Sequence, residues 1–174
     1  MKRLMTIAAM VLSLVLAAAS AASASTTASR SGTEVIAGST TNLSIILANV
    51  SVVPVTAYGV VRTKGTISLG GSANGTSSFN FRAGKLTVKH TQTSGGSQPT
   101  FNQKTCVASL TEGGVYTVVG GTGSFSGARG HGKFKVYFAI VFPRLKNGKC
   151  NTSQSARPVS GKISFLAYGP LSVR

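Results

Sequence analysis

The sequence has no aspartate and no tryptophan, and only two of its 174 residues are acidic. The two acids, Glu34 and Glu112, lie far apart in the chain. Paired-carboxylate catalysis and a Ser-His-Asp triad both require acids in fixed positions, so this scarcity argues against both mechanisms. Calcium and magnesium sites need clustered oxygen ligands, usually carboxylates, and are disfavoured for the same reason. We therefore expect no metal and no cofactor, and we assign no catalytic residue.

Cysteine and histidine are also scarce, with two residues of each. Two isolated cysteines and distant histidines make a poor zinc site, because zinc needs several ligands close together. In an oxidising compartment an even number of cysteines instead predicts a disulfide. A bond between Cys106 and Cys150 would close a loop of about 44 residues, which is worth roughly 4 kcal/mol in the chain-entropy model.

The longest apolar run lies at the N-terminus. Lys2 and Arg3 precede the apolar segment Met5–Ala19, which is too short to span a bilayer comfortably. Ala22-Ser23-Ala24 then fits the small-residue rule for signal-peptide cleavage. We expect a Sec signal peptide over residues 1–24 and a secreted, extracellular product. No later segment has the length and apolarity of a membrane helix, so no membrane span is expected.

The remaining chain divides into two parts by composition. Residues 25–41 are rich in Ser, Thr, Ala and Gly without an apolar period, which indicates a flexible leader. Residues 42–174 form one expected domain of short β-type runs, and no window has a helical period. The clearest strand is Gly132–Phe142, where apolar and mostly basic or small side chains alternate. The other expected strands are Leu43–Val53, Tyr58–Leu69, Ser77–Arg82, Lys85–Thr91, Cys106–Leu110, Val115–Val119 and Ile163–Val173, with a hairpin turn around Glu112-Gly113-Gly114.

About eight short strands in one domain indicate an all-β fold, either a closed antiparallel β-barrel or a β-sandwich. The spacing of the turns does not choose between the two. Full closure would remove exposed sheet edges, and Leu43–Val53 has little charge to protect it as an edge strand.

The stretch Tyr116–Gly130 combines an apolar β-branched run, a glycine-rich turn, an aromatic residue and an arginine. Gly120, Gly121 and Gly123 allow positive φ, so the chain can reverse tightly between two strands. The stretch resembles the glycine-rich signature of the dirigent and allene oxide cyclase barrel superfamily, especially its bacterial secreted members. This resemblance implies a closed antiparallel barrel with a central cavity, and it favours the barrel over the sandwich.

The resemblance also implies two types of activity, the steering of phenoxy radicals and the cyclisation of an epoxide, and both involve acidic residues in the cavity. Here one acid lies in the expected leader and the other in an expected turn, so only the glycine turn and Arg129 carry over. We therefore expect a protein that binds a small apolar or phenolic ligand in its barrel, and we favour binding over catalysis. An isomerase or dirigent-type enzyme that steers a reactive intermediate stays open as the alternative.

Four side chains are candidates for contact with such a ligand. Arg129 would share a face with Phe125 if the strand alternates regularly, and would then attract an anionic or electron-rich group; otherwise it faces water at the rim. His90 lies on the apolar side of its expected strand. It could donate a hydrogen bond to a ligand in the cavity, or it could be a hydrogen-bonded residue of the core. Tyr116 and Tyr137 could offer hydroxyl groups, although core or interface roles also explain them.

The net charge of +16 indicates a further possible partner, a polyanion. Lysines and arginines alternate with apolar residues in several runs, so they are expected to face outward. Such a surface attracts polyanions in a salt-dependent manner, and an anionic cell-wall polymer is therefore an alternative partner. Charge that only keeps the protein soluble explains the pattern equally well. No motif indicates specific nucleic-acid binding, and a homo-oligomer stays open because no interface is recognisable.

Overall fold

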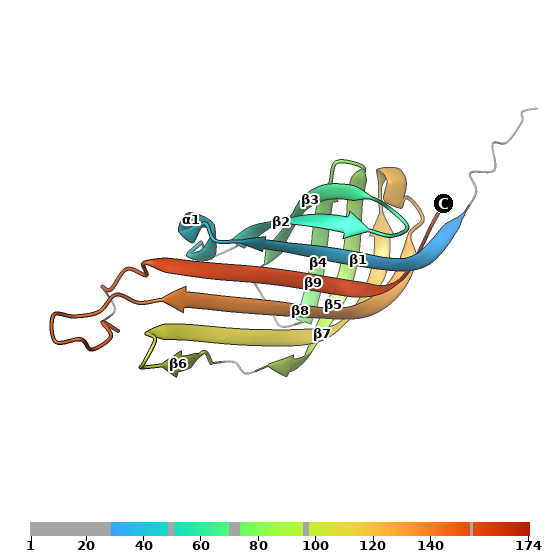
Figure 1. The fold of residues 1–174 in the computed structure, drawn as a ribbon. Helices are drawn as coiled ribbons and strands as arrows, with labels where there is room; N and C mark the ends of the chain where they lie inside the picture. The colour runs from blue at the N-terminus through green and yellow to red at the C-terminus, as the bar shows by residue number, and fades with distance from the viewer. Residues whose placement is uncertain (1–28, 49–50, 70–73, 96–97, 154) are drawn as a thin grey trace, which may run out of the picture.

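The computed structural model is a closed antiparallel β-barrel, so the expected all-β barrel is confirmed and the β-sandwich is wrong (Figure 1). It describes residues 29–48, 51–69, 74–95, 98–153 and 155–174. The barrel closes in the order β1-β2-β3-β4-β5-β7-β8-β9 and back to β1, while β6 pairs with β7 beyond the end of β5. The elements are β1 (Arg30–Thr40), α1 (Leu43–Ile46), β2 (Ser51–Tyr58), β3 (Thr63–Leu69), β4 (Asn74–Phe81), β5 (Gly84–Gly95), β6 (Thr100–Asn102), β7 (Val107–Gly121), the 3-10 turn η1 (Gly123–Phe125), β8 (Arg129–Val141) and β9 (Ser160–Val173).

Strand β1 occupies most of the segment that was expected to be a flexible leader, so that expectation is wrong from Arg30 to Thr40. The strand pairs with β9 along its whole length and with β2 over Val35–Gly38. Its glycine, alanine and glutamate residues have little strand propensity of their own, but flanking strands satisfy its backbone groups whatever the side chains are. The expected signal peptide, residues 1–24, lies outside the described residues.

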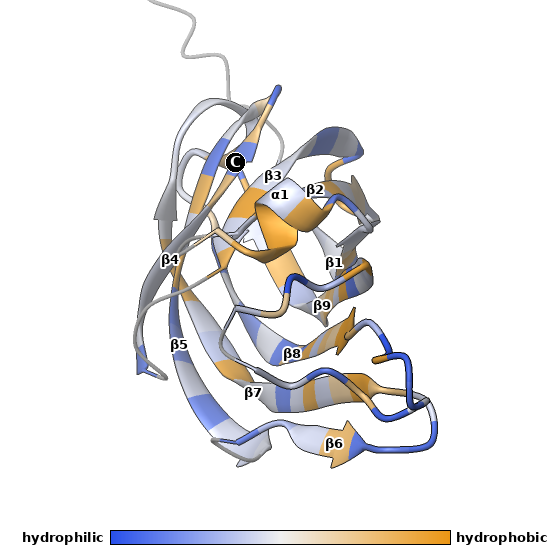
Figure 2. Cartoon of the chain, turned by 90° about the vertical axis from the view of Figure 1, so that its left-hand side faces the viewer, coloured by the Kyte–Doolittle hydropathy of each residue, from blue (hydrophilic) through white to orange (hydrophobic). Residues whose placement is uncertain are grey.

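The segment after β1 also differs from the expected strand Leu43–Val53. Its first part is the short helix α1, whose N-cap residue Asn42 accepts a hydrogen bond of 3.0 Å from the backbone N–H of Ser44. Such a local side-chain bond stabilises a helix start and competes with strand pairing. The helix lies at one end of the barrel, where it contacts β2 and β9 and buries Ile46 (Figure 2).

Strand β7 is continuous through Glu112-Gly113-Gly114, so the hairpin expected there is wrong. The strand changes partner near this point instead. β6 pairs with residues 107–109 of β7, whereas β5 pairs with residues 112–121 and shifts register between Gln92 and Ser94. Glycines inside a strand commonly accompany such irregular pairing.

The chain reverses between β7 and β8 later than the three glycines suggested. Gly120 and Gly121 belong to β7, and only Gly123 has a positive φ, of +58°. A Cβ at Gly123 would collide with the carbonyl oxygen of Ala83, so glycine is needed there for both conformation and space. The expected role in the reversal therefore holds for Gly123 and is wrong for the two glycines before it.

The predicted disulfide is confirmed, since Cys106 and Cys150 are bonded. Cys106 precedes β7 and is almost fully buried, with 1% of its surface exposed. Cys150 belongs to the long segment between β8 and β9 and forms a β-bridge with Arg144 of the same segment. The disulfide therefore fastens that segment to the sheet at the β6–β7 end of the barrel.

Candidate functional site

One row of inward positions crosses five neighbouring strands of the barrel wall. It runs from Glu34 on β1 to its partner Gly169 on β9, which lies against Gly132 on β8, and from Gly132 through its partner Tyr116 on β7 to His90 on β5. Directly paired residues lie on the same face of a sheet, so all five point toward the interior. We call Glu34, Tyr116 and His90 the polar row. The fold thus brings together three polar side chains from distant parts of the sequence, two of them separated by glycines.

Glu34 is the buried acid of this row, and the sequence interpretation missed it. Its side chain is 2% exposed, and its Oε2 accepts a hydrogen bond of 2.9 Å from the backbone N–H of Val61. Oε1 is also buried and accepts no hydrogen bond from any residue that the structure describes. Burial raises the pKa of Glu34 above its ordinary value, although the backbone N–H groups of Val61 and Val60 lower it. A buried carboxylate with one free oxygen is therefore built into the barrel interior.

Tyr116 lies over a position that has no side chain. A Cβ at Gly132 would be 2.6 Å from the hydroxyl oxygen of Tyr116, so the glycine leaves the space that the phenol group occupies. Burial, and secondly the negative charge of Glu34, raise the pKa of Tyr116 to about 12. The hydroxyl group is therefore neutral at physiological pH and can donate a hydrogen bond.

His90 completes the row on the other side of Tyr116. Its Nδ1 lies 3.3 Å from Oγ of Ser77 on β4, within hydrogen-bonding distance. Its ring meets the ring of Phe134 edge to face, with 6.0 Å between the centroids. The ring is half-buried rather than fully enclosed. His90 is thus a hydrogen-bonded inward residue that still presents part of its surface.

The apolar wall beside the polar row is not fully covered. The inward side chains of β8 pack against the core but remain half-buried, whereas those of β2 and β9 are fully buried. Solvent therefore reaches part of the inner surface on the β8 side of the barrel. The half-buried inward residues of β8 are Phe134, Val136, Phe138 and Ile140.

Arg129 and Tyr137 do not reach this interior. Both are exposed on the outer face of β8, where they alternate with the inward residues. The expectation that Arg129 shares a face with Phe125 is wrong, because Phe125 belongs to η1 and is 0% exposed. Of the four sequence candidates, the fold brings only Tyr116 and His90 together.

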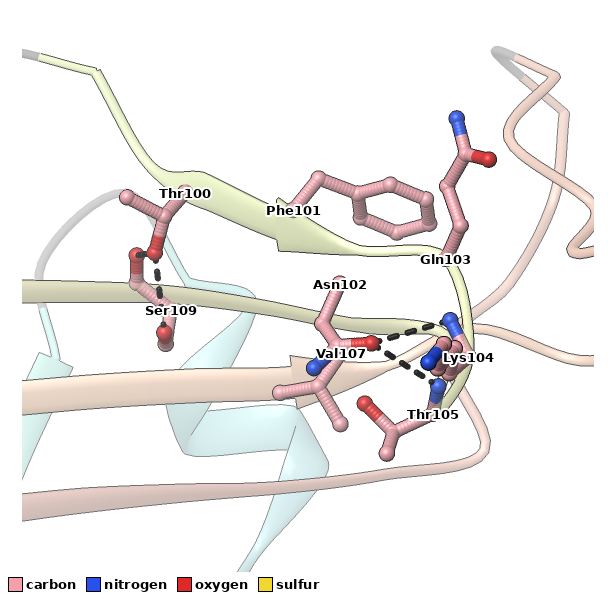
Figure 3. Close-up of a pocket in the computed structure, with 8 residues that line it drawn as sticks. All are labelled: Thr100, Phe101, Asn102, Gln103, Lys104, Thr105, Val107 and Ser109. Carbon is pink, nitrogen blue, oxygen red and sulfur yellow. Dashed lines mark hydrogen bonds between the residues drawn. The ribbon is translucent and has the colours of Figure 1, made fainter.

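A second hollow lies outside the barrel, at β6 and the turn that follows it (Figure 3). Its polar groups are largely used within the hollow itself. Oδ1 of Asn102 accepts hydrogen bonds from the backbone N–H groups of Lys104 and Thr105, at 2.9 and 3.2 Å. The hydroxyl group of Thr100 donates to the carbonyl oxygen of Ser109 at 3.2 Å. The hollow is wide open and contains none of the residues predicted from the sequence, so the interior row is the stronger candidate.

In the part of the chain that the structure describes, no helix is long and apolar enough to cross a membrane. Nor does that part contain a group of three or more His, Cys, Asp or Glu side chains that could hold a metal ion.

Comparisons with known proteins add little. No family model matches the chain, and no curated protein matches it. Among solved structures, a pterocarpan synthase dirigent protein aligns over 82% of this chain and 85% of its own length, with 10% sequence identity and a TM-score of 0.29. A likeness at that score supports no argument about function, so the proposals below depend on the geometry of this chain.

Proposed function

We propose that the protein binds a small apolar or phenolic ligand inside its barrel, between the polar row and the inner face of β8. The observation that carries the proposal is the partial exposure of that apolar inner face beside a buried acid and a phenol group. Small-ligand sites are mostly apolar and contain a few polar groups that fix orientation. Barrels of about eight strands are of a size that can hold one such ligand.

Each residue of the site has a distinct role in this proposal. The rings of Phe134 and Phe138 provide apolar contact with the body of the ligand. The neutral hydroxyl group of Tyr116 donates a hydrogen bond to a ligand oxygen, and the free oxygen of Glu34 accepts one from a phenolic hydroxyl group. His90 orients the ligand from the β5 side. A phenol, with one polar end and an apolar body, satisfies all of these groups together.

The family assignment is part of this proposal. The glycine-rich stretch Tyr116–Gly130 and the closed antiparallel barrel are both compatible with a dirigent-like protein. The signal peptide and secretion are proposed with it, and the disulfide supports them because disulfides persist mainly in oxidising compartments.

A second candidate function is an enzyme of the dirigent or cyclase type, and one observation favours it. The sequence argument against this activity was that no acid lies in a barrel strand, but Glu34 is on β1 and faces the interior. A carboxyl group next to a neutral phenol could hold or move a proton on a reactive intermediate. Altered product ratios in phenoxy-radical coupling, lost in the Glu34→Gln variant, would support the enzyme over the simple binding protein.

Binding is tested with the neutral dye Nile red, which fluoresces in apolar sites, and with para-propylphenol as a competitor. A neutral dye is needed because the basic exterior would attract an anionic one. We expect saturable dye binding that para-propylphenol displaces. Tyr116→Phe should weaken the competitor about three- to tenfold, as expected when one hydrogen bond of about 1 kcal/mol is lost.

The matched control is Tyr137→Phe, which removes the same hydroxyl group from the outer face of the neighbouring strand. It should leave both dye binding and competition unchanged. Equal effects of the two substitutions, or a dye signal that para-propylphenol never displaces, would contradict a site in the interior.

A further inference from the structure

The outer surface of the barrel is charged with one sign only. Glu34 faces the interior, where only 2% of its side chain is exposed. Glu112 pairs directly with Val136, whose side chain packs against the core, so this acid also lies on the inner face. Because the chain has only these two acids, every charged side chain on the described outer face is basic.

The basic residues are most regularly arranged along the outer face of β8. Arg129, His131, Lys133 and Lys135 occupy alternate positions, and all four are exposed. At about 3.4 Å per residue, they span roughly 20 Å along the strand with a repeat near 7 Å. We call these four residues the basic strip. Arg129, Lys133 and Lys135 are the cations of this strip, and a row of cations along one strand matches a linear polyanion better than it matches a compact anion.

Exposed aromatic and apolar side chains lie beside the basic strip. Tyr168 on β9 pairs with Lys133, and Leu166 pairs with Lys135. Tyr168 and Tyr58 both pair with Val35 on β1, one on each side of it, so the two tyrosines lie in one row about 10 Å apart. Tyr58 is 55% exposed and Tyr168 is 46% exposed, which is high for aromatic residues in a barrel wall.

We propose that the outer face of β8, β9 and β1 binds a linear acidic polysaccharide, with the basic strip on its carboxylates and Tyr58 and Tyr168 on the apolar faces of its sugar rings. Charge complementarity selects an anionic partner and opposes a second copy of this chain, because two such faces would repel each other. A nucleic-acid duplex offers charge but no free ring faces for the tyrosines. An acidic polysaccharide offers both along one chain.

The first test compares two double variants that lose the same charge. Lys133→Gln with Lys135→Gln removes two charges from the basic strip. Lys64→Gln with Arg82→Gln removes two from β3 and the turn after β4, on the opposite side of the closed barrel. Binding of fluorescently labelled oligogalacturonate is measured by anisotropy across a salt series, with neutral dextran as the uncharged control.

We expect the strip variant to bind oligogalacturonate about tenfold more weakly at low salt, and to lower the slope of log affinity against log salt by about one to two. The opposite-side variant should change affinity less than about twofold, since it alters only the overall field. Equal losses in the two variants would overturn the proposed site and leave only a diffuse attraction. Nile red binding should be unchanged in both variants, which separates this test from that of the interior ligand.

The second test identifies the class of polymer. Inorganic polyphosphate has negative charges but no sugar rings, so the strip variant should weaken its binding while Tyr168→Ala leaves it unchanged. The same Tyr168→Ala variant should weaken oligogalacturonate binding several-fold. Tighter binding of single-stranded DNA than of oligogalacturonate of equal charge would overturn the polysaccharide assignment, as would a tyrosine variant without effect on either polymer.

Discussion

The carboxylate of Glu34 on β1 accepts a hydrogen bond of 2.9 Å from the backbone N–H of Val61, in the turn between β2 and β3. Both residues are buried, at 2% and 4% exposed. This contact holds the turn against the barrel and leaves one carboxylate oxygen for the interior. Glu34 is therefore both a structural anchor and the polar end of the proposed site.

The raised pKa of Glu34 predicts a specific dependence of stability on pH. Because burial raises this pKa in the folded state, folding favours the protonated form. The resulting stabilisation is complete below the unfolded value of 4.5 and is lost as pH rises through the folded pKa. The Glu34→Gln variant cannot show this loss. Denaturant unfolding at a series of pH values should therefore show the wild type losing stability relative to the variant as pH rises from below 4.5 toward neutrality. A difference that is constant with pH would contradict this prediction.

The pKa of Tyr116 can be measured directly, because the protein has no tryptophan to obscure tyrosinate absorbance. A spectrophotometric titration of the wild type should contain a step at about 12. Tyr116→Phe should abolish this step, whereas Tyr168→Phe should leave it in place. Glu34→Gln should move the step toward 10.0, since the negative charge of Glu34 is one of the two causes that raise it. If the pKa of this step is the same in the Glu34→Gln variant as in the wild type, the two groups are not coupled.

The disulfide is expected to contribute strongly to stability. The Cys106–Cys150 bond closes a loop with a sequence separation of 44. Replacing both cysteines with alanine should lower the free energy of unfolding by about 2–5 kcal/mol. Chemical denaturation of the oxidised protein, the reduced protein and the double variant measures this. The reduced protein should behave like the double variant, and a reduced protein as stable as the oxidised one would contradict the prediction.

Phe125 should be the main anchor of the corner between β7 and β8. Its side chain is 0% exposed and stacks on Phe81, with 5.1 Å between ring centroids. Phe125→Ala removes a fully buried ring and should destabilise the protein by about 3–5 kcal/mol. The control Val119→Ala, at a side chain that is 56% exposed, should change stability by less than about 0.5 kcal/mol. Similar values for the two variants would mean that the corner does not anchor the barrel.

The alternation of side chains along β8 and β9 was predictable from the sequence, because each strand has one face in the core and one in solvent. Glu34 was missed for the opposite reason. Its neighbours Gly32, Ala37 and Gly38 have weak strand propensity, and the pairing of β1 with two flanking strands outweighs that propensity. The alternation of Glu34 and Ile36 with Val35 and Ala37 was the available signal, but four residues are too few to separate a strand from a leader.

The candidate site could not be located from the sequence, because its location depends on the register in which the strands pair. Tyr116 and His90 were singled out by residue type and local pattern, but nothing in the sequence indicates that they pair directly. The continuity of β7 through Gly113 and Gly114 was equally hidden, because a glycine pair between apolar runs usually marks a turn. Only the partner strands on both sides show that the backbone continues there.

The interior site is tested most directly by contacts between para-propylphenol and the methyl groups of the protein, measured as nuclear Overhauser effects. Val136 and Ile140 are half-buried on the inner face of β8, whereas Val115 and Val119 are 44% and 56% exposed on the outer face of β7. A ligand inside the barrel should give contacts to Val136 or Ile140 and none to Val115 and Val119. Contacts confined to Val115 and Val119 would place the ligand on the outer surface and contradict the proposed function.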